Sequence, residues 1–230
     1  MDQAGGLRVL LVGGTGLVGA HALTMLLESP KVAQVVSLVR KPTGLTPTGQ
    51  QHAKLRELVV DFATLTDLPP DVRVDAVLCA LGTTRKDAGS DAAFQDVDLK
   101  YVVTVAKAAR RAGATFFGGV SSVDADSTSH RLYLKTKGMM EDYVATLGFT
   151  SRHFLRPSLL LGRRRQDRPL ERFFQLLAPV IGPFLSGRLE KYRPIPAKVV
   201  AAALVTTASQ PAIGGVRTHE YSAIRSLAGM

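Results

Sequence analysis

Tyr133 and Lys137 are the two residues whose types and spacing most directly indicate chemistry. They stand four positions apart, so a helix through this segment places both side chains on one face. A tyrosine that transfers a proton near neutral pH needs its pKa lowered from about 10, and a neighbouring ammonium does this by favouring the phenolate. The same spacing also occurs in ordinary surface pairs, so other residues must support a catalytic interpretation.

Two hydroxyl groups that could complete such a site precede this pair. Ser121 and Ser122 directly follow an apolar stretch, residues 115–120, which we expect to be a strand. A hydroxyl at that place can hold a carbonyl oxygen while a tyrosine delivers the proton and a nicotinamide delivers hydride. The combination predicts hydride transfer to a carbonyl or from an alcohol.

A glycine-rich segment near the start of the chain indicates where a dinucleotide would bind. The glycines at positions 13, 16 and 19 permit a tight turn, close approach of the backbone to a pyrophosphate, and close packing of helix on strand. The phosphates would sit on the unpaired amides of the following helix. The alternative is a tight turn without a ligand. The residues expected to line the cofactor here are Gly13, Gly14, Thr15, Gly16, Leu17, Val18 and Gly19.

The residues after the second predicted strand bear on the choice of cofactor. An acidic residue there would accept from the ribose 2′-hydroxyl, whereas an arginine accommodates a 2′-phosphate. The chain has Arg40 and Lys41, so we expect NADP(H) to be favoured over NAD(H), although a solvated basic pair is the alternative. Asp61 is placed either to accept from the adenine amino group or to cap the next helix.

The elements that must position these residues follow from alternating apolar and helical patterns. Strands alternating with helices predict an α/β fold, with a doubly wound parallel (Rossmann) sheet. We expect one domain, residues 1–230, in which residues 163–230 form most of a small helical, substrate-side C-terminal lobe. The predicted strands are 7–12, 35–39, 58–60, 74–80, 115–120 and 150–155, and the predicted helices are 17–28, 92–112 and 133–147.

Composition excludes several classes of protein. The chain has 230 residues, one cysteine and a net charge of +10. No Cys/His cluster has zinc-ligand spacing, no apolar run approaches the ~20 residues of a membrane helix, and residues 1–10 do not read as a signal peptide. Residues 1–149 contain 16 basic and 15 acidic side chains, whereas residues 150–230 contain 13 and four. The excess is local, so nucleic acid is not the expected partner.

The motifs together resemble a known group of enzymes. Gly13-x-x-Gly16-x-x-Gly19, Ser121-Ser122 and Tyr133-x-x-x-Lys137 look like those of the short-chain dehydrogenase/reductase superfamily, in its atypical branch. More narrowly, the segments CALGTTR (79–85), YLK (133–135) and RPSLLLG (156–162) resemble the Tat-interacting-protein oxidoreductase type, over about residues 7–205. The resemblance implies an NADPH-binding Rossmann domain with a small C-terminal lobe.

The resemblance also implies roles for individual residues. Ser122 would orient the substrate carbonyl, Tyr133 would act as general acid/base, and Lys137 would bind the ribose and lower the pKa of the tyrosine. The gap of 11 residues from Ser122 to Tyr133 is shorter than usual in the superfamily, which leaves open which serine points inward. Asp98 occupies the position of an asparagine that supports a proton relay in other branches, and it replaces that role, abolishes it, or is an ordinary helix residue. The other residues expected at the cofactor are Phe62, Leu81, Gly82, Thr83, Arg156, Pro157 and Ser158.

We therefore expect an NADP(H)-dependent oxidoreductase acting on a small carbonyl or alcohol, either anionic or neutral, in a cytoplasmic monomer or homodimer. Fewer than 70 residues follow Gly162, which disfavours epimerase or dehydratase chemistry on a large nucleotide sugar. The alternative is an NADPH-binding regulatory protein with little turnover that acts through a protein partner. The apolar segment 173–181 is a candidate surface for that partner, although we favour a role for it in covering the substrate cleft. Anion binding by Arg163, Arg164, Arg165 and Arg168, or a solvated role for them, stays open.

Overall fold

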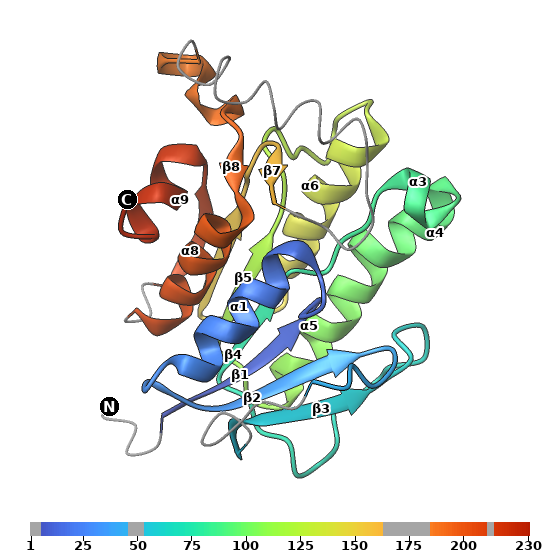
Figure 1. Cartoon of the computed structure of the whole chain (residues 1–230). Coiled ribbons are helices and arrows are strands. Elements are labelled where there is room, and N and C mark those ends of the chain that lie inside the picture. The colour runs from blue at the N-terminus through green and yellow to red at the C-terminus, as the bar shows by residue number, and fades with distance from the viewer. Residues whose placement is uncertain (1–5, 46–52, 163–184, 211–213) are drawn as a thin grey trace.

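A parallel sheet of seven strands forms the centre of the molecule (Figure 1). The computed structural model describes residues 6–45, 53–162, 185–210 and 214–230. The strand order is β3-β2-β1-β4-β5-β6-β9, and every neighbouring pair is parallel. The strands are β1 (Leu7–Val12), β2 (Val32–Val39), β3 (Leu55–Val59), β4 (Ala76–Cys79), β5 (Phe116–Val120), β6 (Ser151–Leu155) and β9 (Gly215–His219). The direction of winding reverses between β1 and β4, and in such sheets ligands bind at the carboxyl ends beside that reversal.

Helices cover both faces of this sheet, which confirms the doubly wound α/β fold predicted from the sequence. On one face α1 (Leu17–Glu28), α8 (Ala197–Ser209) and α9 (Tyr221–Leu227) bury one apolar core. On the other face α5 (Tyr101–Arg111) and α6 (Leu132–Ala145) bury a second. The interior strands carry unbroken apolar runs because both of their faces are buried, as Val9–Val12 shows with no exposed surface.

The predicted helix 92–112 is two helices joined by a wider turn. The segment consists of α4 (Asp91–Gln95), a π-helical turn η1 (Asp96–Lys100) and then α5. A short helix, α3 (Arg85–Ala88), precedes it. A π-turn accommodates one extra residue within a helix, which apolar periodicity does not reveal. It follows that the side chains on either side of η1 lie on different faces from those expected of a continuous helix.

The C-terminal part of the chain contributes more to the main sheet than the sequence indicated. β9 pairs with β6 as the seventh strand, and α8 packs on α1 and on the sheet. The sequence of β9, GVRTH, has little apolar character because this edge strand is largely exposed. The remaining elements are β7 (Leu160–Leu161), β8 (Ile195–Pro196) and the 3₁₀ helix η3 (Gly187–Tyr192), with β7 and β8 paired in a small second sheet.

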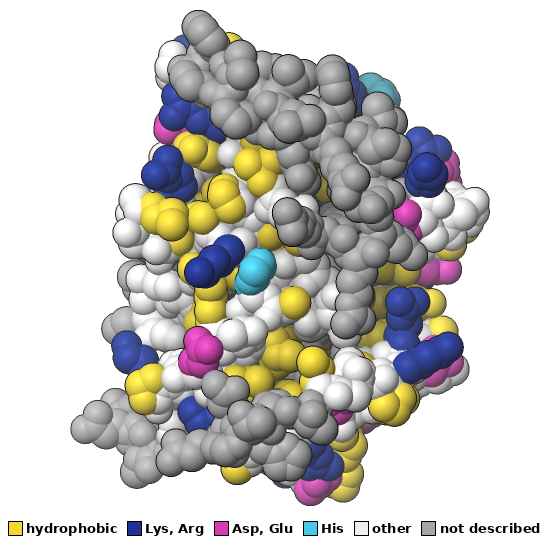
Figure 2. All heavy atoms as spheres, viewed as in Figure 1, with side chains coloured by type: hydrophobic (Ala, Val, Ile, Leu, Met, Phe, Trp, Pro, Cys, Tyr) yellow, Lys and Arg dark blue, Asp and Glu magenta, His cyan; other side chains and the backbone are white. Residues whose placement is uncertain are grey.

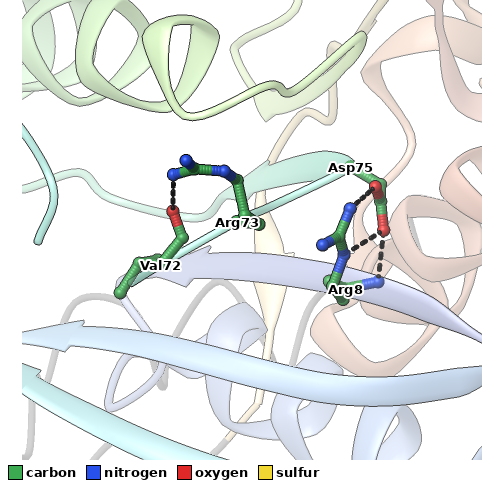
Figure 3. Close-up of polar contacts among 4 residues, drawn as sticks. All are labelled: Arg8, Val72, Arg73 and Asp75. Atoms are coloured by element: carbon green, nitrogen blue, oxygen red, sulfur yellow. Dashed lines mark hydrogen bonds and ion pairs between the residues drawn. The ribbon is translucent and has the colours of Figure 1, made fainter. Parts of the chain in front are cut away.

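An ion pair connects Arg8, near the amino end of β1, to Asp75, which directly precedes β4 (Figure 3). The Arg8 guanidinium donates from Nη2 and Nε to Asp75 at 2.6 and 3.0 Å, and the Arg8 amide donates to the same carboxylate at 2.9 Å. Burial opposes ionisation of Asp75, but these hydrogen bonds hold its pKa below the ordinary value. Nearby, Arg73 donates to the carbonyl of Val72. The contacts lie at the opposite end of the sheet from the carboxyl edge and so stabilise the register of β1 and β4.

Charged side chains on the described surface are mixed in sign. Figure 2 shows Lys and Arg spread over the face in view, with Asp and Glu close to several of them. Of the helices in the described ranges, none has the length and apolar character needed to cross a bilayer. The arginine cluster 163–168 and the apolar segment 173–181, both singled out in the sequence, lie outside the described residues.

Candidate active site

The glycine loop between β1 and α1 approaches a second strand end very closely. Gly13 has φ of +79°, and a Cβ built on it would lie 2.6 Å from the carbonyl carbon and oxygen of Ala80. A Cβ on Gly19 would lie 2.0 Å from the carbonyl oxygen of Gly13. Both positions therefore exclude a side chain, and the loop lies directly against the segment that follows β4.

No side chain of the described residues caps the amino end of α1. Gly16 is its N-cap and supplies no side-chain hydrogen bond, and the first turn carries no acidic residue. The first amides of a helix lack partners within the helix and carry its positive dipole end, so they attract phosphate. The loop and this helix end fit a dinucleotide pyrophosphate.

A buried ion pair lies beside the loop after β4. The Nζ of Lys137 is 2.6 Å from Oδ1 of Asp98, and the side chains are 5% and 1% exposed. The other carboxylate oxygen of Asp98 accepts from the backbone amide of Thr83 at 2.7 Å. Gly82 leaves room for the pair, since a Cβ on it would lie 3.2 Å from Oδ1 of Asp98. The structure thus brings Gly82, Thr83 and Lys137 together and places Asp98 between them.

Tyr133 lies one turn before Lys137, near the start of α6. Its side chain is 39% exposed, and its ring packs against that of buried Phe94 with centroids 5.7 Å apart. Burial lowers the pKa of Lys137, but the attraction of Asp98 and of Tyr133 outweighs it and the pKa is raised above the ordinary value. Lys137 is therefore a cation at neutral pH, and it lies one helical turn from a partly exposed tyrosine.

The two serines at the end of β5 differ in their surroundings. Both are buried, at 4% and 7% exposure for Ser121 and Ser122. The hydroxyl of Ser122 donates to the carbonyl of Val123 at 3.2 Å, whereas that of Ser121 is buried with no hydrogen-bond partner among the described residues. Val120 packs on the α1 side of the sheet, so by strand alternation Ser121 points to the side of α6. Ser121 is thus a second candidate, beside Ser122, for the hydroxyl that would orient the substrate carbonyl.

The loop between β5 and α6, residues 121–131, begins with these serines and is called the serine loop below. It packs closely against α6. The amide of Asp126 donates to the carbonyl of Leu134 at 3.2 Å, and a Cβ on Gly138 would lie 2.1 Å from the nitrogen of Ser127. The helix that carries Tyr133 and the loop that carries Ser122 are therefore in backbone contact. The carboxyl edge of the sheet unites the glycine loop, the serines and the Tyr133–Lys137 helix.

Comparison with known proteins agrees with this arrangement. A family model described as NAD(P)H-binding matches residues 13–171, which includes the glycine loop, the serines and both residues of the Tyr133–Lys137 pair. The chain belongs to the NAD(P)H-binding family. The NAD(P)-binding Rossmann domain implied by the sequence is thereby confirmed.

Relatives and solved structures extend this result. The chain is 38% identical over 185 residues to a mitochondrial Fmp52 protein of Aspergillus clavatus, covering 78% of each, and 32% identical over 183 residues to that of Candida albicans, covering 79% of this chain and 78% of that protein. A putative NAD-dependent epimerase/dehydratase from Bacillus halodurans has a similar fold, with a TM-score of 0.65 at 20% identity, covering 97% of this chain and 99% of that one. A UDP-N-acetylglucosamine 4-epimerase from Methanobrevibacter ruminantium has a TM-score of 0.68 at 16% identity, covering 94% and 77%.

One sequence-based expectation is corrected by these relatives. We expected a cytoplasmic protein, from the lack of a membrane-length apolar run and of a signal peptide. The related Fmp52 proteins of Aspergillus and Candida are named as mitochondrial, so the expectation of a cytoplasmic location is wrong. Composition could not show this, because a net positive charge occurs in proteins of both compartments.

In this NAD(P)H-binding protein the residues expected to select the cofactor lie at the carboxyl edge of the sheet. Arg40 and Lys41 follow β2 and are exposed, and no ion pair of either is found among the described residues. Asp61 accepts from the Ala63 amide at 2.9 Å and from the Thr64 hydroxyl, so it caps a turn rather than a helix. Phe62 is buried and stacks on Tyr101, so its ring belongs to the core.

Residues after β6 are held by contacts that the sequence did not indicate. The guanidinium of Arg156 donates to both carboxylate oxygens of Glu141, at 3.0 and 2.6 Å. The carbonyl of Pro157 accepts from the Val123 amide, and Ser158 donates to the carbonyl of Arg193. These three residues therefore join α6, the serine loop and the C-terminal segment, and Arg156 is committed to a carboxylate of this chain.

Asp124 is a residue of this region that sequence reasoning missed. It lies two positions after Ser122 with φ of +58°, and it accepts from Nζ of Lys191 at 2.5 Å and from the Tyr192 hydroxyl at 2.6 Å. Those hydrogen bonds lower its pKa. Aspartate tolerates this left-handed conformation better than most residues. Asp124 thus ties the serine loop to η3, which comes from the C-terminal part of the chain.

Proposed function

We propose that the chain is an NADP(H)-dependent oxidoreductase that interconverts a small carbonyl compound and its alcohol. The observation that carries this proposal is the placement of Tyr133 one helical turn from the buried ammonium of Lys137, on a helix in contact with the serine loop. The family and the fold supply the nucleotide-binding frame, and these residues supply the groups for proton transfer.

In this proposal, different residues bind the cofactor, orient the substrate and transfer the proton. Gly13 to Gly19 and the amino end of α1 would bind the pyrophosphate, and Arg40 with Lys41 would bind a 2′-phosphate. The cofactor, when bound, supplies or accepts hydride. A serine hydroxyl, Ser122 or its neighbour Ser121, would orient the substrate oxygen, and Tyr133 would donate the proton to it or accept the proton from it. Lys137 would hold the ribose and keep a positive charge beside the tyrosine.

The experiment is NADPH oxidation with a panel of small aldehydes and ketones, compared between the wild type and Tyr133→Phe. Proton transfer by a side chain contributes about 100-fold or more, so the variant should lose that factor in kcat while binding NADPH normally. Tyr143→Phe is the matched control, because Tyr143 is an exposed tyrosine on the same helix. Equal turnover in wild type and Tyr133→Phe would reject the proposed mechanism.

The second candidate is an NADPH-binding regulatory protein with little turnover. It is favoured by the identity of Asp98, a carboxylate at the position where the resemblance implies an asparagine that supports a proton relay. Two measurements together separate the candidates: titration of NADPH binding by fluorescence, and the assay of NADPH oxidation with the carbonyl panel. Binding of NADPH with no oxidation by any carbonyl of the panel would support the regulatory protein over the enzyme.

A further inference from the structure

Asp98 is the residue through which two parts of the candidate site are connected. One carboxylate oxygen lies 2.6 Å from Nζ of Lys137 on α6, and the other accepts from the Thr83 amide in the loop after β4. Its side chain is 1% exposed. A carboxylate this deeply buried is costly unless it is paired and hydrogen-bonded, so both contacts are needed for it to remain charged.

The helix changes its geometry where it carries Asp98. The π-turn η1 spans Asp96–Lys100, between α4 and α5. π-Turns insert an extra residue and occur frequently at functional sites. Asp96, on the same turn, pairs instead with Lys100 at the surface, where the side chains are 35% and 71% exposed. The turn therefore separates two acidic residues, one paired with a lysine of the same turn and one paired with Lys137 of α6.

Few other charges act on Lys137. On α6, Tyr133 precedes it by one turn, and Glu141 follows it by one turn but is bound at both oxygens by Arg156. On β4, burial raises the pKa of the Cys79 thiol to about 11, so that neighbour is neutral. Asp98 is thus the carboxylate that balances the Lys137 charge among the groups described around it.

We propose that Asp98 is a positioning residue of the active site, which fixes the Lys137 ammonium beside Tyr133 and couples it to the loop 81–83. The proposal rests on the proposed function, in which Lys137 serves the cofactor ribose and supports Tyr133. An asparagine at position 98 would keep an acceptor for the Thr83 amide but would leave the buried ammonium without a counter-charge. The role of Asp98 is therefore electrostatic as well as geometric.

The first test is independent of activity. Lysine side chains are labelled with ¹³C at Cε, the Lys137 signal is assigned with Lys137→Arg, and its titration is followed by NMR. In Asp98→Asn the Lys137 midpoint should fall by at least about one pH unit, because burial then acts without the opposing attraction. Asp96→Asn, on the same turn, should leave the Lys137 midpoint unchanged. A Lys137 midpoint equal in wild type and Asp98→Asn would overturn the proposal even if the protein has no enzymatic activity.

The second test uses turnover and cofactor binding. With a carbonyl substrate that the wild type reduces, Asp98→Asn should shift the alkaline limb of the kcat profile to lower pH, and Asp98→Ala, which also loses the Thr83 contact, should bind NADPH at least about tenfold more weakly. Circular dichroism and thermal melting confirm that each variant is folded. Superimposable pH profiles of wild type and Asp98→Asn would overturn the proposal. If the wild type reduces no carbonyl of the panel, that result counts against the proposed function alone.

Discussion

The Cα of Gly138 lies so close to Ser127 that a Cβ on the glycine would stand 2.1 Å from the serine backbone nitrogen. The carbonyl carbon of Asp126 would be 2.3 Å away. Both neighbours are backbone atoms, which cannot rotate aside as a side chain can. Gly138 directly follows Lys137, so this contact determines how closely the loop bearing Ser122 approaches α6.

Gly138→Ala should therefore destabilise the protein, and it should lower turnover more than NADPH binding. Overpacking a tight site typically costs about 1–3 kcal/mol, and here the loop must move to make room. Urea unfolding measures the stability, and steady-state kinetics measure the turnover. Gly214→Ala is the control, because a Cβ there would meet its nearest atom at 3.6 Å. If Gly138→Ala unfolds at the same urea concentration as the wild type, the contact is not as rigid as the structure indicates.

A pair of histidines makes the stability depend on pH. His153 on β6 is 7% exposed, and its Nδ1 lies 3.0 Å from Nε2 of His219 on β9. Burial, and then the repulsion of His219 and Arg217, lowers the pKa of His153 to about 4, and burial also lowers the pKa of His219. The unfolded chain binds these protons near pH 6.5, before the folded protein does. The stabilisation is therefore complete above pH 7 and is lost as the pH falls toward 4.

For His153 alone this loss amounts to about 3 kcal/mol, since one pKa unit corresponds to 1.36 kcal/mol. The free energy of unfolding in urea at pH 8, 7, 6 and 5 measures the part of this loss that is reached by pH 5, about 2 kcal/mol. His153→Gln should flatten the decline below pH 7, whereas His21→Gln, which removes an exposed histidine on α1, should not. The same slope in wild type and His153→Gln would contradict the assignment.

The sequence predicted those elements of the fold that a pattern of adjacent residues identifies. The apolar run of β1 and the glycine spacing after it predicted the nucleotide loop, because these depend on residues adjacent in the chain. β9 was not predicted, since an exposed edge strand such as GVRTH need not alternate or be apolar. The break at Asp96–Lys100 was missed because a π-turn leaves composition unchanged.

The residues of the candidate site could be predicted where they lie close together in the sequence. Tyr133 and Lys137 share one helix, so their spacing is informative. The partner of Lys137 is 39 positions away at Asp98, and Asp124 meets Lys191 across 67 positions, so no local pattern reports either contact. Gly138 lies inside a helix, where a glycine signals only a weak helix former unless the neighbouring loop is known.

Asp124 should control the attachment of the serine loop to η3. Its carboxylate accepts from Lys191 and Tyr192, and Asp124→Asn removes the charge while keeping a residue that tolerates the left-handed backbone. Partly exposed ion pairs contribute at most about 1 kcal/mol, so amide exchange in residues 122–128 and 187–192 should rise by no more than about fivefold. Asp71→Asn, which removes the surface pair with Arg56, should leave those amides unchanged. Unaltered exchange in both segments of Asp124→Asn would show that other contacts hold the loop.

The proposed preference for NADPH over NADH should depend on Arg40. The residue follows β2 at the carboxyl edge, is exposed, and pairs with no acidic residue of the described chain, so its guanidinium is available to a 2′-phosphate. A hydrogen bond to a charged group contributes about 1.5–3 kcal/mol, so Arg40→Ala should weaken NADPH binding by about tenfold or more. NADH lacks the phosphate and should bind both proteins equally. Fluorescence titrations with each cofactor measure the ratio, with Arg56→Ala as a control that removes an arginine from neighbouring β3. A ratio of the two dissociation constants that does not change in Arg40→Ala would rule out this residue as the selector of NADPH.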